Sequence, residues 1–90
     1  MYSKKVIVKN PTGLHARPGS MFAMKALEFQ STIKISKTSD PSLELNAKSL
    51  MKLLALGVTQ GEEVEIKAEG TDEKEAVDTL VEFIDNGCGE

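Results

Sequence analysis

The sequence is poor in the residues that build metal sites and disulfide frameworks. Its 90 residues include one cysteine, one histidine, one arginine and no tryptophan, and aromatic residues make up 4%. One cysteine cannot form an internal disulfide, and with one histidine it cannot complete the ligand set of a zinc site. The sequence therefore predicts no metal site. We expect Cys88, in the tail at 86–90, to be an incidental exposed thiol, with redox or dimer chemistry as the alternative.

Basic clusters and long apolar runs are also missing. The net charge is −3 and no run of Lys or Arg occurs, so the sequence does not indicate a nucleic-acid surface. No apolar stretch approaches the ~20 residues of a membrane span, and residues 1–5 do not resemble a signal peptide. We expect no direct nucleic-acid binding, no membrane insertion and a cytoplasmic location. The length and the 40% apolar content predict one small core and a single domain over residues 1–90. We expect a monomer, with an exchange of elements between two copies as the alternative.

Hydrophobic periodicity predicts four strands and three helices. The strands are expected at 2–9, 32–36, 43–46 and 64–68, and the helices at 16–28, 46–57 and 72–85. Asn46 is a good N-cap, Gly57 is a good helix end, and Asp72 with Glu75 resembles a capping box. The residues expected to face the core are Val6, Val8, Phe22, Ala23, Ala26, Leu27, Ile33, Ile35, Leu43, Leu45, Leu53, Leu56, Val77, Leu80, Val81 and Ile84.

The strands alternate between apolar and polar residues, which is typical of an antiparallel sheet with one wet face. The order of elements is β-α-β-β-α-β-α. These features predict an α+β fold in which a four-stranded antiparallel sheet carries three helices on one face. A polar turn is expected at 37–42 between the second and third strands.

The stretch 12–18, Thr-Gly-Leu-His-Ala-Arg-Pro, holds the only histidine and the only arginine, just before a predicted helix. A helix N-terminus offers free backbone N–H groups and a positive dipole end to an anion. Imidazole is a nucleophile near neutral pH, and a guanidinium donates two hydrogen bonds to a phosphate. The pattern suits phosphoryl chemistry on His15, although a surface histidine at a helix start would be the usual interpretation of the residue types alone.

Residues 13–18, Gly-Leu-His-Ala-Arg-Pro, resemble the active-site signature of the HPr family, histidine-containing phosphocarriers of the bacterial phosphoenolpyruvate:sugar phosphotransferase system. The resemblance extends along essentially the whole chain and implies an open-faced β-sandwich with strand order 1-4-2-3. It implies that His15 accepts a phosphoryl group on Nδ1 from enzyme I and passes it to IIA domains of sugar permeases. Such a protein is a stoichiometric carrier, not an enzyme, and needs no cofactor.

The same resemblance assigns supporting roles around His15. Arg17 would clamp the phosphate, and Thr12 with the backbone N–H groups of Ala16 and Arg17 would assist. Pro18 falls in the first turn of the helix, where a missing N–H breaks no intrahelical bond. Gly19 departs from the family, which usually has Ala or Ser there. We expect Gly19 to loosen the site or to admit the backbone of a partner.

A second candidate site lies in the predicted helix at 46–57. The stretch 46–53, Asn-Ala-Lys-Ser-Leu-Met-Lys-Leu, resembles the regulatory serine region of Gram-positive HPr, which HPr kinase/phosphorylase modifies. Ser49 would then be a regulatory phosphorylation site, and its phosphorylated form would bind a catabolite control transcription factor. The alternative is a serine that uses its hydroxyl locally at a helix start.

This helix is apolar nearly all round, so part of it is expected to be exposed as a partner surface. The residues predicted to form a docking patch near the histidine are Ser20, Met24, Leu50, Met51 and Leu54, with Lys25, Lys48 and Lys52 steering acidic partners. Internal packing of some of these residues is the alternative. Three other functions remain open: a mainly regulatory co-effector of carbon catabolite repression that acts through phosphorylated Ser49, a carrier of a nitrogen-regulatory branch, and a small binding domain of another kind.

Overall fold

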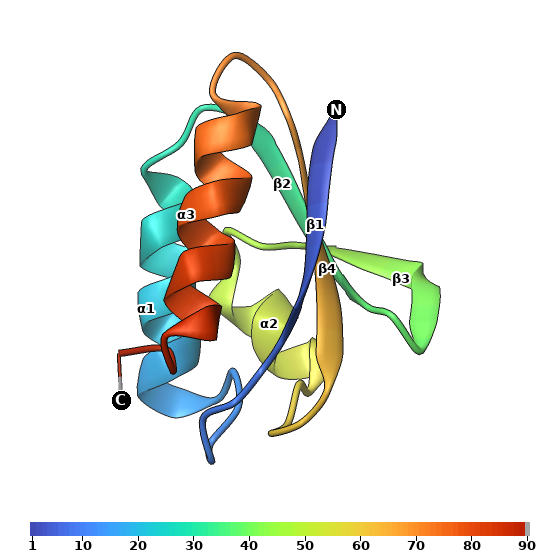
Figure 1. Ribbon diagram of the computed structural model, residues 1–90, viewed down its shortest axis with the longest axis vertical. Coiled ribbons are helices and arrows are strands. Elements are labelled where there is room, and N and C mark those ends of the chain that lie inside the picture. The colour runs from blue at the N-terminus through green and yellow to red at the C-terminus, as the bar shows by residue number, and fades with distance from the viewer. Residues whose placement is uncertain (90) are drawn as a thin grey trace.

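The computed structural model describes residues 1–89, which form four strands and three helices in the predicted order. Figure 1 shows how these elements are arranged. The strands are β1 (Tyr2–Ile7), β2 (Thr32–Lys37), β3 (Asp40–Asn46) and β4 (Glu63–Glu69). The helices are α1 (Ala16–Leu27), α2 (Leu50–Leu56) and α3 (Glu73–Asp85).

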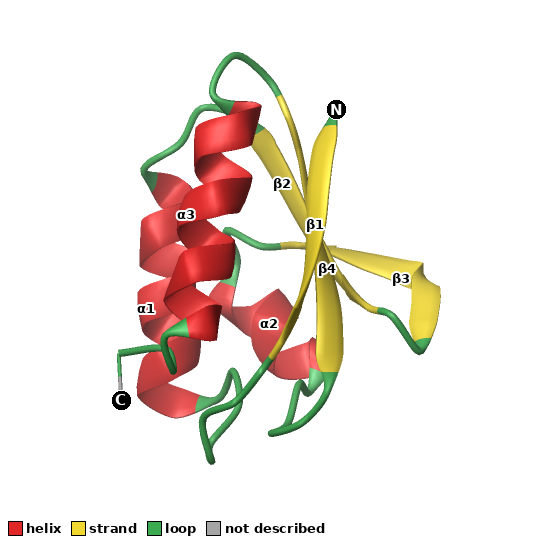
Figure 2. Ribbon diagram, viewed as in Figure 1, coloured by secondary structure: helices red, strands yellow, loops and turns green. Residues whose placement is uncertain are grey.

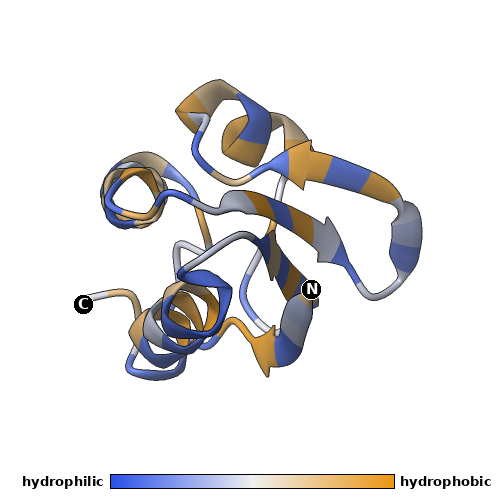
Figure 3. Ribbon diagram, turned by 90° about the horizontal axis from the view of Figure 1, so that it is seen from above, coloured by the Kyte–Doolittle hydropathy of each residue, from blue (hydrophilic) through white to orange (hydrophobic). Residues whose placement is uncertain are grey.

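The strands form one antiparallel sheet in the order β1-β4-β2-β3, which confirms the order implied by the resemblance. The three helices cover one face of this sheet and leave the other face open (Figure 2). Val6 pairs with Val64, and Ile35 pairs with both Ile66 and Leu45, so apolar residues share the face beneath the helices. Figure 3 shows the same alternation as stripes of opposite hydropathy along the strands.

The core fills the layer between the sheet and the helices. Most of the predicted core positions are buried, including both of those in β2, and Val81 of α3 is partly buried against the core. Each fully buried large apolar side chain contributes about 1.5–3 kcal/mol relative to an exposed one. The predicted core residues that the structure confirms as buried are Val6, Val8, Phe22, Ala23, Ala26, Ile33, Ile35, Leu53, Leu56, Val77, Leu80 and Ile84.

The β3 strand differs from the prediction in length and in burial. The predicted turn at 37–42 shrinks to residues 38–39, since β3 begins at Asp40 and is seven residues long. Leu43 is 45% exposed, so its prediction as a core residue is wrong, and Leu45 is only partly buried. β3 is an edge strand, and part of it reaches beyond the helices (Figure 1), so its apolar residues are less buried than those of the central strands.

Two helix predictions are also corrected. Leu27 is 63% exposed because it lies three residues after Met24, on the side of α1 that faces away from the sheet. Asp72 is the N-cap residue of α3 but makes no side-chain capping bond. Its carboxylate instead accepts hydrogen bonds from the N–H groups of Gln30 and Ser31, both at 2.9 Å, and from the Ser31 hydroxyl. This connection joins the α1–β2 loop to the β4–α3 loop.

The expectation that Cys88 is exposed is wrong, because the side chain is fully buried. After α3 the chain turns back on itself: the N–H of Cys88 donates to the carbonyl oxygen of Phe83 at 2.9 Å, and that of Gly87 donates to Ile84 at 3.0 Å. Cys88 adopts a left-handed backbone conformation with φ 56°. The tail therefore covers the end of the core.

Candidate functional site

The loop that precedes His15 packs against the segment after α2. Leu14 is fully buried, and its N–H donates to the carbonyl oxygen of Val58 at 3.1 Å. Gly13 has φ 64°, and a Cβ atom at this position would overlap the Val58 carbonyl oxygen. Only glycine combines this backbone conformation with so close an approach. The loop is therefore fixed immediately before the histidine.

His15 is the N-cap residue of α1 and has an extended backbone, with φ −108° and ψ 162°. Its ring does not cap the helix. Instead, Nδ1 lies 3.1 Å from the carbonyl oxygen of Thr12. Because a carbonyl oxygen only accepts, Nδ1 carries a hydrogen in this arrangement. The side chain is half-buried, and the first N–H groups of α1 have no partner within the helix.

The residues after His15 combine an exposed cation with a strained backbone. Ala16 has φ 52°, a left-handed conformation that costs a residue with a Cβ atom about 1–3 kcal/mol. Arg17 is exposed, and Pro18 is buried in the first turn of α1. The structure thus brings the imidazole, the guanidinium and the helix N-terminus to one exposed place. Ala16 and Arg17 are exposed and His15 is half-buried, so the site lies at the protein surface.

Close packing within the protein accounts for glycine at position 19. A Cβ atom at this position would lie 2.5 Å from the carbonyl oxygen of Leu14. Glycine therefore lets the first turn of α1 pack directly against the peptide that precedes His15. The N–H of Gly19 donates a long hydrogen bond, 3.4 Å, to the carbonyl oxygen of His15. The prediction that Gly19 admits the backbone of a partner is replaced by this internal contact.

An exposed apolar surface lies next to this site, where α1 and α2 pack together. Met24 and Met51 are 64% and 82% exposed, and Leu50 and Leu54 are 37% and 43% exposed. These four residues and the half-buried Ser20 form what we call the apolar patch. The predicted exposure of the patch is confirmed.

Two of the lysines expected beside the apolar patch have intramolecular contacts. Lys48 Nζ donates to the carbonyl oxygen of Phe29 at 2.7 Å, and Lys25 Nζ lies 5.4 Å from the centre of the Phe83 ring. Lys48 therefore ties the segment before α2 to the residues that follow α1. The exposed Lys52 is the lysine of α2 that faces solvent beside the patch.

Ser49 lies just before α2, which starts three residues later than Asn46 would have placed it. Ser49 is the N-cap residue, and its Oγ accepts a hydrogen bond from the N–H of Lys52 at 3.3 Å. Asn46 Oδ1 instead accepts from the N–H of Lys48 at 3.0 Å, within the turn that leads to Ser49. The serine hydroxyl is half-buried and lies beside the exposed Leu50.

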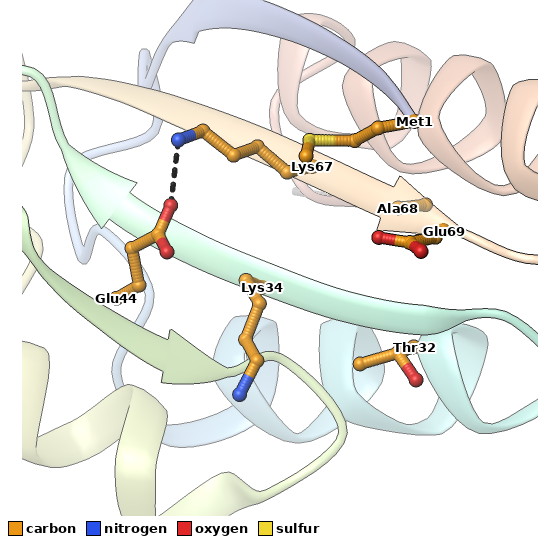
Figure 4. Close-up of a pocket in the computed structure, with 7 residues that line it drawn as sticks. All are labelled: Met1, Thr32, Lys34, Glu44, Lys67, Ala68 and Glu69. Atoms are coloured by element: carbon orange, nitrogen blue, oxygen red, sulfur yellow. Dashed lines mark ion pairs between the residues drawn. The ribbon is translucent and has the colours of Figure 1, made fainter.

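A groove of about 430 Å³ lies on the open face of the sheet, and all of its lining residues lie outside the predicted site (Figure 4). Lys67 Nζ forms an ion pair with Glu44 at 2.6 Å, and this contact raises the pKa of Lys67. Lys34 extends away from that pair (Figure 4). The groove carries both signs of charge and no side chain positioned for group transfer.

The analysis of the sequence did not identify Asn10 as part of the site. The side chain of Asn10 is 3% exposed and hydrogen-bonded to the loop that carries His15. Within residues 1–89, no three side chains of His, Cys, Asp or Glu lie together as ligands for a metal ion. No helix in that part of the chain has the length and apolar character needed to cross a bilayer.

Comparison with known proteins agrees with this geometry. Residues 2–86 match the family model described as PTS HPr component phosphorylation site. The phosphocarrier protein HPr of Mycoplasma pneumoniae is 45% identical over 76 residues, which are 84% of each chain. The multiphosphoryl transfer protein of Vibrio cholerae is 43% identical over 83 residues, which are 92% of this chain and 21% of that protein.

The crystal structure of HPr-C-His from Thermoanaerobacter tengcongensis superposes with a TM-score of 0.93 at 43% identity, covering 100% of this chain and 98% of that one. The family match spans the His15 loop, all three helices and the whole sheet. The chain therefore belongs to the HPr family, the phosphocarrier proteins of the phosphotransferase system.

Proposed function

We propose that His15 is the residue that carries the phosphoryl group. The observation that carries this proposal is the position of the imidazole at the N-cap of α1, beside the exposed Arg17 and next to helix N–H groups. A phosphoryl group on Nδ1 would have its oxygens near those N–H groups and the guanidinium. The contact between Nδ1 and the Thr12 carbonyl must break first, since the attacking nitrogen needs its lone pair.

In this proposal the chain acts as a stoichiometric carrier in the cytoplasm and not as an enzyme. Enzyme I donates the phosphoryl group, and IIA domains of sugar permeases accept it. The apolar patch would contact both partners, because it is exposed and its Leu50 side chain packs beside Gly19 at the start of α1. Methionine side chains are flexible and polarisable, so Met24 and Met51 suit a surface that binds several partners.

The test is incubation with phosphoenolpyruvate, Mg²⁺ and an enzyme I, followed by mass measurement before and after mild acid. We expect one acid-labile phosphate on the native chain and none on His15→Ala. Arg17→Ala should retain the site and acquire the phosphate more slowly. An acid-stable adduct, or equal labelling of His15→Ala, would contradict the assignment of His15.

A second function is supported by Ser49. Its hydroxyl is half-buried at the start of α2, beside exposed apolar residues. Phosphorylation there would place about two negative charges at a helix N-terminus and next to Leu50 and Met51. We propose that HPr kinase/phosphorylase modifies Ser49, that the charge weakens docking at the apolar patch, and that a catabolite control transcription factor binds the product. ATP-dependent, acid-stable labelling that is lost in Ser49→Ala is the expected result.

A further inference from the structure

Asn10 holds the loop that leads to His15 through both its side chain and its backbone. The buried Nδ2 donates to the carbonyl oxygen of Gly13 at 2.7 Å and to the Thr12 hydroxyl at 3.2 Å. The carbonyl oxygen of Asn10 accepts a hydrogen bond from the N–H of Gly13 at 3.1 Å. A single residue therefore binds the polar groups on both sides of the Gly13 Cα atom.

These bonds fix the peptide unit that faces the histidine. The Thr12 carbonyl and the Gly13 N–H belong to the same planar peptide group. The main-chain carbonyl of Asn10 holds the N–H end of this group, and the C=O end accepts a hydrogen bond from His15 Nδ1 at 3.1 Å. The Asn10 side chain holds the Thr12 hydroxyl and the Gly13 carbonyl on either side of the group, and these are the bonds that a substitution of Asn10 removes. The orientation of this peptide plane therefore sets which ring nitrogen of His15 carries the hydrogen and which way the ring is turned.

We propose that Asn10 is a positioning residue for phosphoryl transfer at His15. Acting through the peptide between Thr12 and Gly13, it holds the resting imidazole in the Nδ1–H tautomer, with Nδ1 turned toward the loop at the start of α1. This role rests on the proposed function of His15. Because Nδ1 must lose this hydrogen and this contact before it attacks, Asn10 restrains the imidazole in its resting state.

The transfer step balances as follows. The Nδ1 proton leaves to water as the Thr12 contact breaks, and Nε2 takes up a proton from water. The Nδ1 lone pair then forms the N–P bond while the bond between phosphorus and the donor's nitrogen breaks, and that electron pair returns to the donor. Asn10 takes no part in the bond changes.

The experiment compares Asn10→Ala with Ser31→Ala. Ser31 is a suitable control because it is also a buried polar residue, 1% exposed, and its hydroxyl bonds Asp72 in the loops at the other end of the sheet. Two quantities are measured at a temperature where both variants are folded. They are the ¹⁵N chemical shifts of the two His15 ring nitrogens above the ring's titration, and the rate of phosphoryl transfer from enzyme I.

In Asn10→Ala we expect the ring to shift toward the Nε2–H tautomer, which free imidazole side chains prefer in water. Transfer should then quicken by up to about tenfold, the scale of one lost hydrogen bond, because Nδ1 has its lone pair free more often. Ser31→Ala should lose a similar amount of thermal stability and keep both the native shifts and the native rate. Native shifts and a native rate in Asn10→Ala would overturn the proposal. Slower transfer in Asn10→Ala would also overturn it, because the resting contact would then not restrain the ring. An equal change of rate in the two variants would overturn it as well, because the effect would then follow stability alone.

If Asn10→Ala does not fold, Asn10→Ser is judged by the same two measurements, since serine keeps a polar atom but cannot reach both acceptors. The ring shifts separate this proposal from the proposed function of His15. A native chain that is never phosphorylated would refute the role of His15. The ring shifts would still report whether Asn10 determines the tautomer of the His15 imidazole.

Discussion

The N-termini of α1 and α2 differ in the use that each makes of its N-cap side chain. His15 turns its ring back to the Thr12 carbonyl and leaves the first N–H groups of α1 without a side-chain acceptor. Ser49 turns its hydroxyl into α2 and accepts the N–H of Lys52. The start of α1 is therefore open to an external anion, whereas the start of α2 is already capped by its own side chain.

This difference fits the two kinds of phosphorylation that we propose. A phosphoryl group that must be passed on is suited to an exposed site such as His15, next to the strained backbone of Ala16 and without a side-chain N-cap. A regulatory phosphate gains from a position where its oxygens replace an existing cap, because the helix then keeps its N-terminal acceptor. The start of α3 is a third case, in which the Asp72 carboxylate bonds a distant loop and not its own helix.

The largest effect is expected from Arg17→Ala, which removes the exposed cation from the open N-terminus of α1. Loss of one preorganised donor to a transferring group typically lowers the rate by about 10²-fold. Stability should stay within experimental error because the side chain is exposed. Single-turnover transfer from phosphorylated enzyme I measures the change. Arg17→Lys keeps the positive charge but lacks the planar guanidinium, so its transfer rate should fall between those of the native chain and Arg17→Ala. A native rate in Arg17→Ala would show that the helix N–H groups suffice.

Gly19→Ala tests whether the open end of α1 depends on its close packing. The new Cβ would meet the Leu14 carbonyl oxygen at 2.5 Å, and overpacking of this kind costs about 1–3 kcal/mol. Alanine gains up to ~1 kcal/mol in helix propensity, so we expect a net decrease in the free energy of unfolding. Urea unfolding measures it. Ala55→Gly, on the exposed side of α2, is the reverse change as a control. An increase in stability in Gly19→Ala would mean that the loop containing Leu14 shifts to accommodate the added Cβ atom.

Ser49→Ala tests the closed end of α2. Loss of the N-cap acceptor should lower the free energy of unfolding by about 1 kcal/mol, since the N–H of Lys52 then loses its partner. Ser49→Asp keeps an acceptor at the N-cap and should retain most of the native stability. Denaturant unfolding of the two variants side by side gives the comparison. Equal loss in both would indicate that the hydroxyl does not cap the helix.

The smallest effect concerns the start of α3 and the pH dependence of stability. The Ser31 hydroxyl and the N–H groups of Gln30 and Ser31 lower the pKa of Asp72. A carboxyl whose pKa is lower in the folded state stabilises the fold above its unfolded pKa of about 3.9, and that contribution is lost as the pH falls through the folded pKa. Ser31→Ala should therefore flatten the acid limb of a stability–pH curve below about pH 4. An unchanged limb would contradict this role for Asp72.

The sheet could be predicted from the sequence because alternation within each strand is a local signal. Ile33 and Ile35 are buried as expected, whereas Leu43 is exposed because burial in β3 depends on how far the helices extend over the sheet. The partner of Asp72 could not be predicted either, since Ser31 lies 41 residues away and a capping box was the local alternative. Cys88 is buried because the tail folds back, which its glycines permit but do not specify.

Part of the candidate site could also be predicted from the sequence, because that signal is local too. His15 and Arg17 are two residues apart, so their combination can be recognised without a structure. The contribution of Asn10 could not be recognised, because its hydrogen bonds exist only once residues 10–13 have closed into their turn. The apolar patch required the packing of α1 against α2, although the apolar character of α2 indicated that part of it would be exposed.

The burial of Cys88 gives the protein a built-in reporter of local unfolding. The single thiol is shielded when the tail is closed, so a thiol reagent modifies it only during excursions in which residues 86–89 detach. At low reagent concentration the labelling rate follows the equilibrium between closed and detached tails. At high concentration it approaches the detachment rate itself. Labelling kinetics can thus follow this end of the molecule during phosphorylation without any introduced probe.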